Sequence, residues 1–78
     1  MTNLEKYNQV FISNFLVREE QLSNMSLGSV SVWDSVGHMG LIAALEEAFD
    51  ITFETDDIID LSSYENGKQI LAKYNVVV

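Results

Sequence analysis

The sequence contains no cysteine and no proline, only four basic residues, and no long apolar run. Without cysteine, the chain has no disulfide framework, no thiolate metal site and no cysteine nucleophile. No segment approaches the roughly 20 apolar residues that a membrane-spanning helix needs, and the first residues lack the basic leader and apolar run of a signal peptide. We therefore expect a soluble, cytoplasmic protein that does not insert into membranes.

Residues 1–78 predict a single domain, because no low-complexity tract or internal repeat divides them. A chain of this length buries only about 60% of the surface that its unfolded form exposes. It has little room for both a core and a deep catalytic cleft. This favours a binding or carrier module and not an enzyme.

Basic residues are scarce and lie near the two ends of the chain. Four stand against twelve acidic residues, for a net charge of −8, and the block from Glu19 to Gly67 contains no lysine or arginine. Such a block repels nucleic acid and anionic lipid, whereas it attracts proteins with basic patches. The alternative is a solvated acidic surface that only aids solubility.

Two amphipathic helices are predicted first. Thr2 and Glu5 fit a capping box, and apolar residues recur at helical spacing over 3–17, namely Leu4, Tyr7, Val10, Phe11 and Phe15. Residues 18–34 lose this period and predict a long loop with apolar anchors. A second helix is predicted over 35–49, with a core face of Leu41, Ile42, Leu45 and Phe49 and with His38 directed towards the core.

The rest of the chain predicts two more helices and no sheet. Thr55 can cap a short helix over 56–61, and Ser62 with Glu65 fits a second capping box that opens a last helix. The ending 75–78 predicts a frayed or weakly docked tail. The predicted fold class is all-α.

Two glycines in the first turns of the second predicted helix are costly, at about 1 kcal/mol each relative to alanine. Gly37 and Gly40 either allow close packing between helices or allow another molecule to come close. We favour the second interpretation, because Gly40 lies away from the predicted core face.

Two constellations of reactive side chains are discounted. Asp34, Ser35 and His38 include the residue types of a catalytic triad, but an aspartate adjacent to the serine cannot lie behind the imidazole. The acids of 56–60 lack the spacing of a calcium loop, so we expect no metal site there. We expect no catalytic residue.

Ser35 is the residue with the clearest chemical potential. A serine at this position has an ordinary explanation, which is capping of the helix. A phosphodiester attached to it would instead lie against unpaired backbone N–H groups and the positive end of the helix dipole. Asp34, directly before it, would complement a metal-assisted phosphoryl transfer to the hydroxyl.

The chain resembles the acyl carrier protein family in Asp34-Ser35-Val36 and in the Leu-Glu-Glu-x-Phe pattern of residues 45–49. Ile58, Leu61 and the Ser62-Ser63 pair follow in the family's order. The tripeptide alone is a weak signal, being the family's Asp-Ser-Leu pattern with one change. The similarity covers most of the chain, and the combined pattern in an acidic chain of this length is specific.

The resemblance implies a four-helix bundle with a long loop between the first two helices and a short third helix. It implies that a separate phosphopantetheinyl transferase attaches 4′-phosphopantetheine from coenzyme A to Ser35, beside Asp34, and that the arm carries an acyl group as a thioester. It further implies a monomer that presents this cargo to acyl-loading ligases, acyltransferases and synthases with basic docking patches. The implied docking residues are Val36, Gly40, Ala43, Glu46 and Glu47, and the implied acyl cleft lies near Phe53, Ile58 and Ile59.

Some residues depart from the family pattern. Gly37, His38 and Gly40 stand where fatty-acid carriers usually have acids, which indicates a specialised biosynthetic pathway. Trp33 either roofs the core or flanks the arm, and we expect His38 to be satisfied by a loop group. Two alternatives stay open: an aminoacyl or peptidyl carrier, including the D-alanyl type, and a structural adaptor that uses the fold without the arm.

Overall fold

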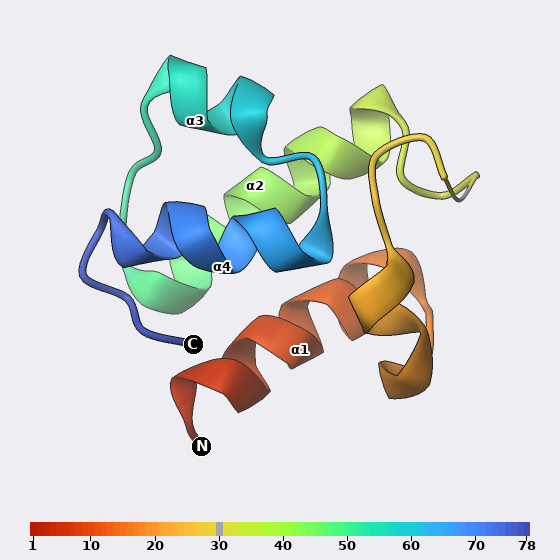
Figure 1. Cartoon of the computed structure of the whole chain (residues 1–78), viewed down its shortest axis with the longest axis horizontal. Coiled ribbons are helices and arrows are strands. Elements are labelled where there is room, and N and C mark those ends of the chain that lie inside the picture. Colours follow the sequence, from red (N-terminus) through yellow and green to blue (C-terminus); the bar gives the residue numbers. More distant parts are fainter. Residues whose placement is uncertain (30) are drawn as a thin grey trace.

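The computed structural model describes residues 1–29 and 31–78, and within them the fold is all-α. Its helices are α1 (Asn3–Phe15), the 3-10 helix η1 (Glu19–Asn24), α2 (Ser35–Phe49), α3 (Thr55–Asp60) and α4 (Tyr64–Ala72) (Figure 1). The predicted bounds of α2 are confirmed, and α1 begins where its capping box predicts. No β-strand forms in the described part; Ser26 and Ser63 make one isolated bridge.

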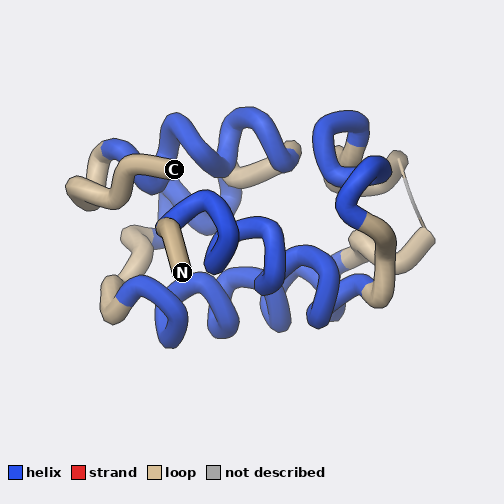
Figure 2. The backbone as a smooth tube through the Cα atoms, turned by 90° about the horizontal axis from the view of Figure 1, so that it is seen from below, coloured by secondary structure: helices blue, strands red, loops and turns tan. Residues whose placement is uncertain are grey.

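The predicted long loop is not wholly irregular, because η1 occupies part of it. Leu22 of η1 and the following Met25 are buried and anchor the segment to the core. Val30, one of the apolar residues of the predicted loop, lies outside the described residues. Figure 2 shows the helices joined by short loops, except for the longer segment that leads into α2.

An aromatic cluster forms the centre of the core. Tyr7, Phe11 and Trp33 are fully buried, and the Phe11 ring meets the Trp33 ring edge-on at a centroid distance of 5.5 Å. The Tyr7 hydroxyl donates to the Tyr64 carbonyl oxygen at 2.7 Å and so joins α1 to α4. The predicted core stripe of α1 is confirmed at its three aromatic residues, whereas Leu4 is exposed. Trp33 therefore belongs to the core.

Helix ends account for three differences from prediction. Phe15 is the last helical residue of α1, because Leu16 adopts a left-handed conformation with φ of 56°. Thr55 is the first residue of α3 and not its cap. The cap of α4 is Ser63, one residue later than expected, because the Ser63 Oγ accepts the Asn66 N–H at 3.0 Å.

The C-terminal tail is docked, contrary to the expectation that it frays. Val76 is 8% exposed, and its N–H donates to the Leu71 carbonyl at 3.1 Å. The Asn3 amide also donates to the Val77 carbonyl at 3.2 Å, so the two ends of the chain meet (Figure 1). Within the described residues, no helix has the length and apolar character needed to span a bilayer.

Candidate functional site

Ser35 is the first residue of α2, but it is not the residue that caps the helix. Asp34 takes that role, because its Oδ1 accepts the Gly37 N–H at 2.9 Å. The capping explanation for Ser35 is therefore wrong. The serine is exposed, and its hydroxyl forms no hydrogen bond with any residue that the structure describes.

The backbone around Ser35 suits an anion. The His38 N–H is the first that bonds back to the Asp34 carbonyl, at 2.8 Å, and Gly37 is satisfied by the cap. The N–H groups of Ser35 and Val36 precede the first intrahelical bond and lie at the positive end of the helix dipole. A phosphate ester on the Ser35 oxygen would lie within reach of these donors.

A cavity of about 340 Å³ opens beside Ser35. Its wall is largely apolar and comes from three segments: Leu27 from the loop, Ser35, His38 and Met39 from α2, and Ile58 and Ile59 from α3. The structure thus brings Ser35 together with two of the three residues predicted for the cleft. Leu27 and Met39 were not predicted as lining residues; Met39 follows the pattern of exposed apolar side chains that Val36 begins on α2.

Phe53, the third predicted cleft residue, does not line this cavity. It is 5% exposed and its ring meets the Tyr74 ring edge-on at 5.2 Å, on the link between α2 and α3. Its N–H donates to Glu46 Oε2 at 2.9 Å. Phe53 therefore contributes to the core beside Tyr74, which follows α4.

His38 has a buried polar side chain in the cavity wall, and both nitrogens of its ring have hydrogen-bond partners inside the protein. The Trp33 indole N–H donates to His38 Nδ1 at 3.1 Å, and Nε2 lies 2.7 Å from the Ile58 carbonyl oxygen. Because Nδ1 accepts, the proton belongs on Nε2, which donates to Ile58. The histidine joins the start of α2 to α3 and leaves no hydrogen-bonding group for a ligand in the cavity.

The predicted docking residues lie on an exposed part of α2. Val36, Gly40, Ala43 and Glu47 are all exposed, and Val36 is 82% exposed. Glu46 differs, because it is half-buried and its carboxylate accepts the Phe53 N–H in the link after α2. Of the two predicted acids, Glu47 is the one whose carboxylate has no such role inside the fold.

Both glycines of α2 are explained by packing inside the molecule. A Cβ added to Gly37 would lie 2.3 Å from the Val32 carbonyl oxygen, and one added to Gly40 would lie 2.9 Å from Asn14 Oδ1. The Asn14 amide donates to the Gly37 carbonyl at 3.0 Å. The glycines therefore let α2 approach the loop and the end of α1, which supports the interpretation that we had not favoured.

Comparisons of the chain with protein-family models, with curated proteins and with solved structures find no significant match.

Proposed function

We propose that the chain is a carrier protein of the acyl carrier type, a four-helix bundle that holds an acyl group as a thioester on a 4′-phosphopantetheine arm attached to Ser35. One observation carries the proposal: Ser35 is exposed at the start of α2, and Asp34 caps the helix in its place. A serine that only ended a loop would be expected to cap the helix itself. This one is left available for modification.

The attachment step uses groups that the chain and coenzyme A supply. The Ser35 oxygen attacks the β-phosphorus of coenzyme A, the bond from that phosphorus to the adenosine bisphosphate half breaks, and the hydroxyl proton passes to the transferase. Asp34 holds the first turn in place through Gly37 and adds negative charge beside the hydroxyl, which complements a transferase metal ion. Once attached, the arm supplies the thiol that a chain without cysteine lacks.

The cavity favours an acyl cargo over an aminoacyl one. Its wall is mostly aliphatic, and its histidine is already bonded to Trp33 and Ile58. An ammonium group placed there would find no free acceptor on that histidine, which makes its burial costly. An aminoacyl carrier would use the same serine, so the mass of the cargo on protein from its native host distinguishes the two.

The test is incubation of the purified chain with coenzyme A and a broad-specificity phosphopantetheinyl transferase, followed by intact-mass measurement. We expect one phosphopantetheine on the wild type and none on Ser35→Ala. Ser31→Ala, an exposed serine in the preceding loop, is the matched control and should be modified normally. An unmodified wild type, or equal modification of Ser35→Ala, would contradict the proposal and favour the structural adaptor.

A further inference from the structure

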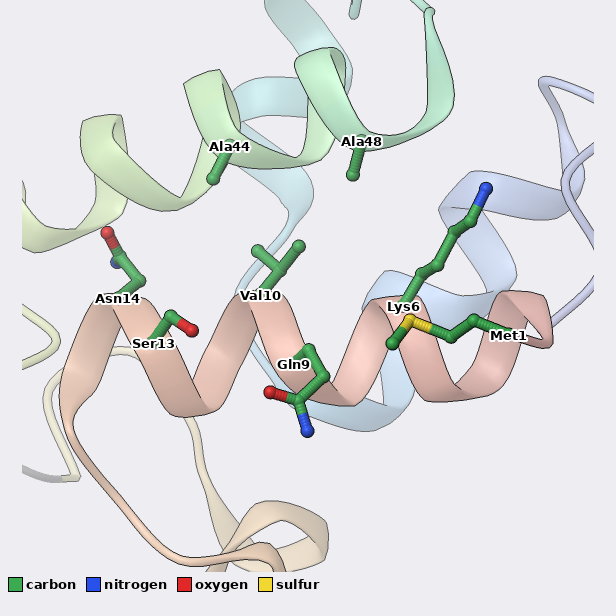
Figure 3. A pocket seen from close by; sticks show the side chains of 8 residues that line it. All are labelled: Met1, Lys6, Gln9, Val10, Ser13, Asn14, Ala44 and Ala48. Atoms are coloured by element: carbon green, nitrogen blue, oxygen red, sulfur yellow. The ribbon is translucent and has the colours of Figure 1, made fainter.

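A second apolar groove of about 460 Å³ lies between α1 and α2 and shares no lining residue with the cavity at Ser35. Val10 of α1 faces Ala44 and Ala48 of α2 across it (Figure 3). The two alanines are one helical turn apart on the same face of α2, so their small side chains keep the groove open. The groove runs along the surface and is open to solvent.

The two ends of the groove differ in chemistry. Asn14 lies at one end, where its amide is fixed by the Gly37 carbonyl at 3.0 Å. Lys6 lies two helical turns away along α1, about 12 Å at a rise of 1.5 Å per residue (Figure 3). An occupant can therefore contact about two turns of apolar surface and meet a positive charge at one end.

Lys6 is the one basic residue without an ion pair among residues 1–29 and 31–78. Arg18 pairs with Glu20 at 3.7 Å, Lys68 with Glu65 at 3.8 Å and Lys73 with Asp57 at 2.6 Å. Of the described residues that line the groove, Lys6 is also the only one with a charged side chain. In a chain of net charge −8, this groove is a place where a negatively charged group meets no lining carboxylate.

We propose that this groove binds one amphipathic helix of a partner protein, with an acidic side chain of that helix paired with Lys6. An open groove between two helices suits a helix laid into it with anchors at i, i+3 or i+4, and i+7. A small ligand is less suited, because such sites bury most of the ligand surface. A second copy of the chain is disfavoured by the repulsion between two molecules of charge −8.

The proposal does not depend on Ser35 or its arm. The probe is a short helical peptide with leucines at i, i+4 and i+7 on one face and a glutamate at the end of that face. It is titrated into the 15N-labelled chain and compared with a peptide in which the glutamate is lysine. We expect saturable shifts of the Val10, Ala44 and Ala48 amides, with tighter binding of the glutamate peptide.

Charge reversal makes the test specific. Lys6→Glu should weaken the glutamate peptide about three- to tenfold and reverse the preference between the two peptides. Arg18→Glu, the same change at an exposed residue outside the groove, should leave the preference unchanged. Ala48→Gln, which fills the groove, should weaken both peptides, with circular dichroism showing that the fold is kept.

Three results would overturn the proposal: no saturable shift at these amides up to millimolar peptide, equal effects of the Lys6 and Arg18 reversals, or self-association of the chain through the groove. Ser35→Ala should bind the peptide as the wild type does. Failure of phosphopantetheine attachment and failure of peptide binding are therefore separate outcomes.

Discussion

Lys73 Nζ lies 2.6 Å from Asp57 Oδ1, so an ion pair joins the short helix α3 to the end of α4. The Asp57 side chain is 6% exposed, and Tyr74 donates to its second oxygen at 2.5 Å. The Tyr74 hydroxyl also accepts the Glu54 N–H at 2.9 Å, directly before α3 begins. These contacts hold in place the helix that supplies Ile58 and Ile59 to the cavity at Ser35.

The pair predicts how stability depends on pH. The hydrogen bond from Lys73, followed by that from Tyr74, holds the pKa of Asp57 below its ordinary value of 3.8. The stabilisation of the fold by the ionised Asp57 carboxylate is therefore complete above pH 3.8 and is lost as the pH falls through the folded-state pKa. The bond to Asp57 raises the pKa of Lys73 above 10.5, so this contribution is complete below 10.5 and is lost at higher pH.

Asp57→Asn should lower the melting temperature at pH 7, and its effect should shrink towards pH 2, as the wild-type carboxyl becomes protonated on passing through its lowered pKa. The measurement is thermal unfolding followed by circular dichroism between pH 2 and pH 8. Asp56→Asn is the control, because Asp56 is exposed on the same turn of α3. An equal destabilisation at both pH values would show that the ion pair is not the source of the effect.

Gly67 is required by the hydroxyl of Tyr7. A Cβ at residue 67 would lie 2.2 Å from that oxygen, and Tyr7 is fully buried and fixed by its bond to Tyr64. Gly67→Ala should therefore destabilise the fold by about 1–3 kcal/mol, as overpacking does. In a chain of this size, each kcal/mol lowers the melting temperature by roughly 4–8 °C.

The same contact predicts non-additivity. Tyr7→Phe removes the oxygen that the new methyl group would meet, so the double variant should be less destabilised than the sum of the two single variants. Chemical denaturation of the four proteins measures this coupling. Strict additivity would mean that the methyl group is accommodated by movement of α4 and not resisted by Tyr7.

Local patterns predicted what depends on neighbours in the chain, and long-range contacts decided the rest. The spacing of apolar residues and the Asp34-Ser35 boundary gave the bounds of α2 correctly. The cap of α4 is Ser63 and not Ser62, and the Asn66 side chain in the first turn of this helix also donates to the Asp60 carbonyl at 2.6 Å. That bond depends on where α3 ends, which periodicity does not specify.

The candidate site shows the same division. Ser35 and its place at a helix start follow from local sequence. The bond from Trp33 to His38 joins residues that are close in the sequence. The contact between His38 and the Ile58 carbonyl joins residues 20 positions apart, so it requires the fold to bring α3 against α2. Phe53 was predicted to line the cavity, but Met39 lines it and Phe53 does not, and this likewise depends on the path of the link after α2.

Glu47 is expected to contribute to partner encounter. Its carboxylate is exposed on α2, so Glu47→Lys should slow phosphopantetheine transfer about three- to tenfold at low salt and less at high salt. Transfer rates across a salt series measure this effect. Glu20→Lys makes the same change of charge on η1 and is the control; equal slowing by both variants would assign the effect to net charge and not to α2.

Met39 is expected to decide how well the cavity shelters an apolar cargo. An octanoyl group on the arm should shift the amide signals of Ile58 and Ile59 more than an acetyl group does, because each buried CH₂ contributes about 0.8 kcal/mol. Met39→Glu places a carboxylate in the wall and should reduce the octanoyl shifts and speed thioester hydrolysis. Met39→Leu, which keeps the volume and polarity of the wall, should behave as the wild type. Equal shifts with octanoyl and acetyl groups would mean that the cargo stays outside the cavity. This result would not bear on whether the arm is attached to Ser35.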